Sequence, residues 1–346
     1  MTRIIPLRYS DMEKVRKMIE YVSPDISVDK VNGETFVHFP FNVLHRFLPV
    51  RLKFLQESYV AIEGEELLGL ISLAPDGNQK TRWKINRLIL NPNAYDAGKQ
   101  LIDYVVNKYG GAGVENFLTT IDENYIEALA LFKTACSFRS CSKINIWEYE
   151  NLKNYAISEN RISLRIVELS DAKKIYELDC EALYPKFKTS LVKTENDFKF
   201  DFGNKFINKL KDYKIQRFVL DNTAKNSIES FLSIMTKDNV NFWVDITLSL
   251  AYQEYYEDVL NFAINHVCSI NQNGKLYIGV RDFQQTGKKM TEVLSQHDFR
   301  QYGSFEVLVK DYWKPAEYAT EKKVPIMIFP DMTSPACNVV SFIKEF

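Results

Sequence analysis

The sequence predicts an α/β (α+β) protein built from two tandem domains, and three observations lead to this prediction. The chain has 346 residues, which is too long for one compact core and suits two domains of roughly 150 residues each. Short apolar strands alternate with amphipathic helices along both halves. The chain also resembles itself at a shift of 160 residues, the separation of Ser10 from Ser170. A duplicated α/β unit accounts for all three.

The repeat is visible as residue types that recur at one offset, which is the signal of an internal duplication. A later match, Phe138-Arg139 with Phe299-Arg300, lies one residue further apart, as a single insertion in a loop would produce. The pairs at the common offset are Ser10-Asp11 and Ser170-Asp171, Trp83 and Trp243, Leu88 and Leu248, Leu90 and Leu250, and Asp122 and Asp282.

Each half begins with a short apolar strand followed by Ser-Asp, a pair that signals the start of a helix because its side-chain oxygens accept backbone N–H groups. A polar turn at 63–66 then predicts a β-hairpin in the first half. The first half has expected strands at 4–8, 58–62, 67–73, 84–90, 114–121 and 138–147, with helices at 12–22, 101–110 and 126–133. The second half has expected strands at 164–167, 217–220, 230–235, 244–250, 275–280 and 305–309, with helices from 172, at 255–267 and at 288–294.

The repeat sets the expected domain boundaries. We expect a first domain at 1–150, a polar linker at 151–160, a second domain at 161–315 and a C-terminal tail at 316–346. The tail contains a strand-like run at 324–329, bounded by Pro325 and Pro330.

Composition narrows the classes of partner. The 44 Lys and Arg residues against 45 Asp and Glu residues give a net charge of -1, so no global field favours nucleic acid or an anionic membrane. Five cysteines without a CxxC pair and four scattered histidines indicate neither a disulfide framework nor a metal site. The N-terminus turns polar within ten residues and no apolar run reaches membrane-spanning length. These features predict a cytoplasmic protein without nucleic-acid or membrane partners.

The best local motif is Arg87-Leu88-Ile89-Leu90-Asn91-Pro92, followed by Asp96-Ala97-Gly98-Lys99-Gln100-Leu101. This segment resembles the central strand and the pyrophosphate-binding loop of the GNAT (N-acetyltransferase) superfamily. The resemblance covers about 1–150 and 160–313, and it implies two tandem domains, each a mixed, mostly antiparallel sheet flanked by helices.

The resemblance also implies acetyl-CoA as a co-substrate of the first domain, with no metal. The backbone of Leu88, Ile89 and Leu90 would bind the pantetheine arm. The pyrophosphate would lie at a helix N-terminus, where N–H groups and the helix dipole favour an anion. The residues implied there are Asp96, Ala97, Gly98, Lys99 and Gln100.

In the GNAT superfamily a tyrosine on the helix after the fifth strand often acts as general acid. Here Phe132 stands at that place, and a phenyl ring has no proton to donate. Glu123 and Tyr125, just beyond the fifth expected strand, are therefore our candidates for the base and the proton donor.

The corresponding loop of the second half, Leu250-Ala251-Tyr252-Gln253-Glu254-Tyr255-Tyr256-Glu257-Asp258, has no glycine. Its bulky side chains and three carboxylates would crowd and repel a phosphate. We therefore expect a degenerate second domain that does not bind CoA in the usual way.

Two functions follow as expectations. The first is an N-acyltransferase that transfers an acetyl group from acetyl-CoA to the amine of a small molecule or peptide. The alternative is a non-catalytic tandem module for protein interaction or ligand sensing, which Phe132 and the glycine-free second loop favour.

Overall fold

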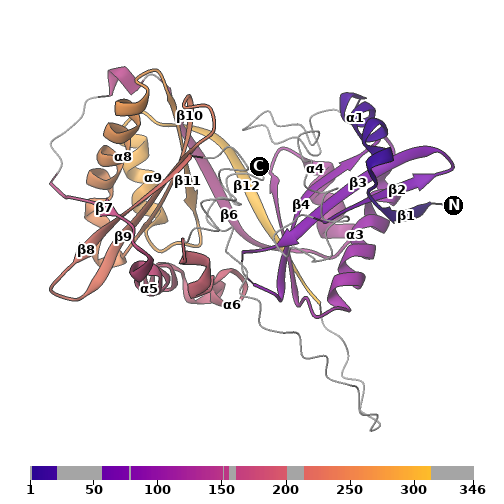
Figure 1. Cartoon of the computed structure of the whole chain (residues 1–346), viewed down its shortest axis with the longest axis horizontal. Coiled ribbons are helices and arrows are strands. Elements are labelled where there is room, and N and C mark those ends of the chain that lie inside the picture. Colours follow the sequence, from indigo (N-terminus) through magenta and orange to yellow (C-terminus); the bar gives the residue numbers. More distant parts are fainter. Residues whose placement is uncertain are drawn as a thin grey trace, which may run out of the picture. The chain divides into compact units, whose positions relative to one another are not determined.

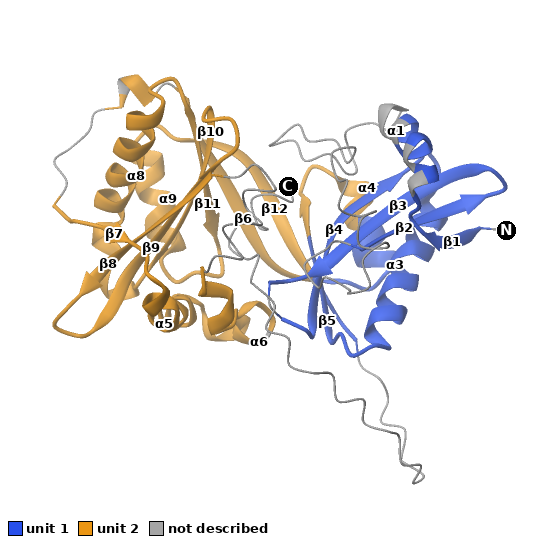
Figure 2. Cartoon of the chain, in the orientation of Figure 1, with its two compact units in different colours: residues 1–119, 130–139, 309–335 blue, residues 120–129, 140–308, 336–346 orange. Residues whose placement is uncertain are grey.

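The structure is a computed structural model that describes residues 2–21, 57–77, 79–150, 152–155, 161–200 and 214–312. The tail predicted at 316–346 lies outside these residues, as does most of the predicted linker. The chain divides into two compact units, which Figure 2 colours separately. The described residues of the first unit fall within Met1–Thr119, Ala130–Arg139 and Val309–Pro335, and those of the second within Thr120–Leu129 and Ser140–Leu308.

The two halves of the sequence contain the same order of elements, which confirms the predicted fold class (Figure 1). The main elements of the first half are β1 (Arg3–Pro6), α1 (Met12–Tyr21), β2 (Glu57–Glu63), β3 (Glu66–Pro75), β4 (Arg82–Leu90), α3 (Tyr95–Gly110), β5 (Asn116–Asp122), α4 (Ile126–Ala130) and β6 (Arg139–Tyr149). Those of the second half are β7 (Arg165–Ile166), α5 (Ala172–Ala182), α6 (Lys188–Leu191), β8 (Lys214–Asn222), β9 (Ser227–Thr236), β10 (Asn241–Leu248), α8 (Tyr256–Ile270), β11 (Lys275–Arg281), α9 (Gly287–Gln296) and β12 (Arg300–Asp311).

The first unit is a sheet with strand order β1-β2-β3-β4-β5. The pairs β1–β2, β2–β3 and β3–β4 are antiparallel, and β4–β5 is parallel. Alternate residues of a strand face opposite sides of the sheet. Ile89 packs in one cluster with Val15 and Met18 of α1, so its neighbours Leu88 and Leu90 face the other side, which α3 covers.

The second unit is a sheet packed between helices. Residues of β9, β10 and β11 form one large apolar cluster with α8 and α9. A second cluster joins Val219 of β8 and Phe231 of β9 to Ile175 and Leu178 of α5. Leu152 and Tyr155, which fall in the predicted linker, are buried within the first of these clusters.

The Ser-Asp pair acts differently from the prediction. The aspartate is the more important residue, because the Asp171 carboxylate accepts the backbone N–H of Glu168 at 2.8 Å in a capping box. The Asp11 carboxylate accepts the N–H of Arg8 at 2.9 Å in the same way. The two halves therefore begin their first helices with the same bond.

Strand β6 lies in the second unit, although it closes the first half of the sequence. It pairs antiparallel with β11, from Tyr149 opposite Leu276 to Ile144 opposite Arg281. It lies between β11 and β12 in the strand order. The last residues of β12 belong in turn to the first unit, where the N–H of Tyr312 donates to the carbonyl of Glu115 at 2.7 Å. Each unit thus contains strand residues from both sequence halves.

Candidate functional site

The parallel ladder between β4 and β5 is short. It pairs Arg82, Trp83 and Lys84 with Asn116, Phe117 and Leu118, while β4 continues to Leu90 in antiparallel pairing with β3. In the described part of the chain, Leu88, Ile89 and Leu90 therefore have a strand partner on the β3 side only. An opening of this kind exposes backbone N–H and C=O groups at one edge of β4, and such groups need partners.

A β-bulge in β4 lies beside the end of this ladder. Ser72 pairs with Arg87 and Leu73 pairs with Ile85, so Asn86 is an extra residue. The side-chain oxygen Oδ1 of Asn86 is buried and accepts no hydrogen bond from the described residues. Bulges are frequent next to active sites, where they redirect a side chain, and a buried acceptor without a donor is costly. Asn86 is therefore a candidate ligand contact, which the sequence pattern did not reveal.

The connection from β4 to α3 is short and held by hydrogen bonds. The backbone N–H of Asn91 donates to Leu68 at 2.8 Å, and its side chain donates to the carbonyl of Leu67 at 2.7 Å. Helix α3 then begins at Tyr95 without a side-chain cap, because Ala94 is the N-cap residue. The first N–H groups of a helix have no partner within it. The start of α3 thus presents N–H groups that have no partner within the helix, at the positive end of a 16-residue helix.

The residues predicted as a phosphate loop lie in the first turns of α3. The loop prediction for residues 96–100 is wrong, because the helix already begins at Tyr95. A Cβ at Gly98 would lie 2.6 Å from Cδ1 of Leu90 and 3.0 Å from Cδ2 of Leu131. Gly98 thus permits close packing of α3 on β4. Lys99 forms an ion pair with Asp103 at 2.5 Å on the exposed face of the helix.

The two predicted proton-transfer residues fall in the second compact unit, whereas the predicted CoA contacts fall in the first. The Glu123 carboxylate pairs with Lys143 at 2.5 Å, and this contact raises the pKa of the Lys143 ammonium. Tyr125 precedes α4 and is half-buried, with its N–H bonded to the carbonyl of Asp122 at 2.9 Å.

Phe132 is buried, with its ring edge-on to that of Phe138 at 5.1 Å between centroids. It lies in a π-helical turn, Leu131–Ala135, that follows α4. The predicted helix at 126–133 is therefore a short α-helix that continues as a π-turn. Such turns are frequent at functional sites, and here the aromatic ring serves the core.

The second half has the same short parallel ladder, but side chains bridge its opening. The ladder of β10 and β11 ends at Val244 and Ile278. Beyond it, Nη2 of Arg281 donates to Oδ2 of Asp245 at 2.5 Å. Both side chains are buried, with exposed fractions of 4% and 5%. Gln284 donates to Thr247 at 3.3 Å in the same region. Counted from the starts of the two parallel ladders, Asn86 and Asp122 of the first half lie in place of the ion pair.

Comparisons with solved structures identify the fold. The structure matches a tandem GNAT protein from the clavulanic acid biosynthesis pathway, solved without acetyl-CoA, with a TM-score of 0.58 and 12% identity over 91% of this chain and 100% of the other. It matches a GCN5-related N-acetyltransferase from Sphaerobacter thermophilus with a TM-score of 0.60 and 9% identity over 90% and 96% of the two chains. A putative acetyltransferase from Pyrococcus horikoshii matches with a TM-score of 0.54 and 12% identity over 99% and 95%.

The protein therefore has the GNAT fold in its tandem, two-domain form. No protein-family model matches the sequence, and no curated protein matches it. At these identities the likeness concerns the fold alone.

No helix among the described residues is both long enough and apolar enough to span a membrane. Among the same residues, no group of three or more His, Cys, Asp or Glu side chains is arranged to hold a metal ion.

Proposed function

We propose that the protein is an N-acyltransferase that binds acetyl-CoA in its first half and transfers the acetyl group to an amine of a small molecule or peptide. The observation that carries the proposal is the combination of a prematurely ended β4–β5 ladder with an uncapped helix start directly after β4. Open amides on β4 suit the amide groups of a pantetheine arm, and the start of α3 suits a pyrophosphate.

The bulge supports the same placement. The unsatisfied oxygen of Asn86 is an acceptor next to the open edge, and a pantetheine arm carries N–H donors. In the second half, by contrast, the Asp245–Arg281 ion pair occupies the equivalent opening. We therefore expect one acetyl-CoA site for each chain.

The reaction is a direct transfer. The amine nitrogen attacks the thioester carbonyl, a C–N bond forms, the C–S bond breaks, and the thiolate of CoA leaves. A base takes the proton from the amine, and a donor protonates the thiolate. Glu123 and Tyr125 are our candidates for these two roles, and the open β4 amides would stabilise the negative charge that develops on the carbonyl oxygen.

Replacing Ala94 by Asp tests the helix terminus without damaging the fold. The new carboxylate would cap α3 and bond the N–H groups that a pyrophosphate needs, and its charge would repel the ligand. We expect the free energy of unfolding to rise by about 0.5–1 kcal/mol. The affinity for acetyl-CoA, measured by calorimetry, should fall at least about tenfold.

Asn107→Asp is the charge-matched control, because Asn107 is exposed near the opposite end of α3. It should leave acetyl-CoA binding unchanged. Equal binding by wild type and Ala94→Asp would contradict the placement of the pyrophosphate. If Ala94→Asp loses binding as expected, acetyl transfer by the wild-type protein is then measured as release of the CoA thiol in the presence of primary amines.

The alternative is a non-catalytic module that uses the tandem fold for protein interaction or ligand sensing. The buried Phe132, at the place of the usual proton donor, favours it. A well-folded wild-type protein that binds no acetyl-CoA would support this alternative over the enzyme.

A further inference from the structure

A polar pocket lies in the second unit, at the end of β8 and β9. Its volume is about 380 Å³, which is within the range of small-molecule sites. The residues around it supply several hydroxyl groups, an amide and three charged groups. The charged groups are Arg161, Asp221 and Glu229, and the polar lining includes Ser163, Asn222 and Tyr252.

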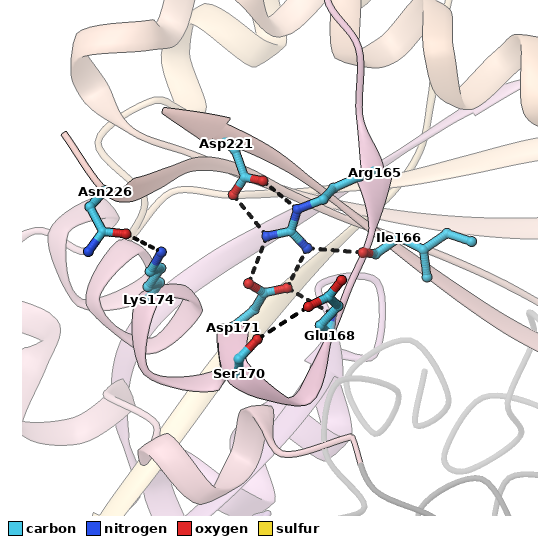
Figure 3. A network of polar contacts seen from close by, with 8 residues as sticks. All are labelled: Arg165, Ile166, Glu168, Ser170, Asp171, Lys174, Asp221 and Asn226. Atoms are coloured by element: carbon cyan, nitrogen blue, oxygen red, sulfur yellow. Dashed lines mark hydrogen bonds and ion pairs between the residues drawn. The ribbon is translucent and has the colours of Figure 1, made fainter. Parts of the chain in front are cut away.

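Two of the three charged groups already have partners outside the pocket. Arg161 binds the Asp258 carboxylate through two nitrogens, at 2.9 Å each. Asp221 is bonded by Arg165, whose guanidinium also binds Asp171 at 2.7 and 2.8 Å (Figure 3). The charges of Arg161 and Asp221 are therefore already engaged in ion pairs with groups outside the pocket.

Glu229 is the third charged group of the pocket. Its side chain is largely buried, with the residue 5% exposed. One oxygen, Oε1, accepts hydrogen bonds from Ser227 at 2.7 Å and from Asn222 at 3.1 Å. Within residues 161–200 and 214–312, no basic side chain forms an ion pair with Glu229, and Oε2 accepts no hydrogen bond. A buried carboxylate of this kind favours a cation as its neighbour.

Glu229 is positioned by a β-bulge. Leu220 of β8 pairs with Ser230 and the next residue, Asp221, pairs with Ile228, so Glu229 is the extra residue of β9. The bulge redirects its side chain, and the backbone carbonyl of Glu229 accepts the N–H of Ser249 at 2.9 Å. The carboxylate is thus held at the wall of the pocket by the sheet.

The first half has the same bulge without the carboxylate. In β2 and β3, Ala61 pairs with Gly69 and Ile62 pairs with Leu67, so Leu68 is the extra residue. The carbonyl of Leu68 accepts an N–H at 2.8 Å from the residue after β4, just as the carbonyl of Glu229 accepts one from the residue after β10. The second half therefore has a carboxylate where the first half has an apolar side chain.

Aromatic rings complete the pocket. Tyr252 and Tyr255 are stacked, with ring centroids 5.8 Å apart. The hydroxyl of Tyr252 accepts a hydrogen bond from Asn222 at 2.7 Å. The ammonium of Lys225 lies 5.6 Å from the Tyr252 ring centroid, so this ring already attracts a cation from the neighbouring turn.

We propose that this pocket is a binding site for a small hydroxylated amine, whose ammonium group pairs with Glu229 and contacts the Tyr252 ring. The hydroxyl groups of the ligand would bond Ser163, Thr223 and Asn222. The site belongs to the second half only and does not depend on acyl transfer by the first.

Saturation-transfer NMR with 4-amino-1-butanol tests the site. The matched neutral probe is 1,4-butanediol, which differs from the amine only in having a hydroxyl group in place of the ammonium group. We expect the amine to bind at least about tenfold more tightly than the diol, because it alone forms a charge-assisted bond. Glu229→Gln should remove this preference while thermal unfolding remains near that of wild type.

Glu292→Gln is the control, since Glu292 is exposed on α9, outside the pocket. It should retain the preference for the amine. Failure of the amine to bind the wild-type protein would overturn the proposal. Equal binding of the two probes, or an unchanged preference in Glu229→Gln, would overturn it as well. Acetyl-CoA binding, measured on the same samples, separates this result from the fate of the proposed function.

Discussion

Arg165 connects two carboxylates in the second unit, and the three groups form the polar network in Figure 3. The hydrogen bonds from Arg165 hold the pKa of Asp171 below its usual value of 3.8. Asp171 in turn accepts the N–H that starts the first helix of this half. At the scale of single residues, one guanidinium therefore links strand β8 to the start of α5.

Arg165→Met should lower the free energy of unfolding by about 1–2 kcal/mol near neutral pH, after allowance for solvent screening of the half-exposed guanidinium. Because the pKa of Asp171 is lower in the folded state than in the unfolded chain, this stabilisation is complete above about pH 3.8. It is lost as the pH falls through the folded-state pKa. Urea unfolding at about pH 7 and at about pH 3 should show the difference from wild type shrinking in acid.

Lys173→Met serves as the comparison for this experiment. Lys173 and Glu177 form an exposed ion pair at 3.8 Å, and such pairs contribute little. An Arg165→Met effect no larger than that of Lys173→Met, or one independent of pH, would count against the network.

Strands β10 and β11 differ from β4 and β5 in what lies beyond the parallel ladder. The second half has a buried ion pair there, and the first half has Asn86 and Asp122 at the matching ladder positions. Removing one partner of a buried pair leaves an uncompensated charge, whereas replacing both by apolar groups is often neutral. At the scale of elements, this difference distinguishes an opening bridged by an ion pair from one that no ion pair among the described residues bridges.

Arg281→Ile should therefore lower the free energy of unfolding by about 3 kcal/mol. The double variant, which carries Asp245→Ile as well, should have a free energy of unfolding within about 1 kcal/mol of that of wild type. Denaturant unfolding of the two single variants and the double variant measures the coupling. Additive losses in the double variant would show that the two charges do not stabilise each other.

Each compact unit contains strand residues from both sequence halves. Strand β6 pairs along β11 in the second unit, so a fragment that begins at residue 151 would leave the edge of β11 uncovered. Exposed edges of long strands promote aggregation. At the scale of the whole molecule, the two repeats are therefore expected to depend on each other for folding.

The fragment 151–346 should be aggregated or poorly folded when expressed by itself, and co-expression with 1–150 should restore a soluble complex. Size-exclusion chromatography and circular dichroism report the outcome. A fragment 151–346 that is monomeric and unfolds at the wild-type temperature would contradict this dependence.

Much of the fold follows from local patterns. The hairpin turn at 63–66, the strand ending at Leu90 and the helix ending at Gly110 all match the structure. Local patterns predicted Gly98 as a loop residue, whereas it lies in the first turn of α3 and packs against Leu90. Asn86 and Glu229 were missed because a bulge depends on the register between two strands, which a single segment does not contain.

The sequence by itself determined the order of elements, the duplication and the loss of glycine from the second loop, since each depends on nearby residues or on comparison of the halves. Only the tertiary structure decided that β6 pairs with β11 and that Asp245 meets Arg281. It also decided that Glu229 lines a pocket. The physical reason is that these contacts join residues far apart in the chain, and side-chain periodicity specifies which face is buried without specifying its partner.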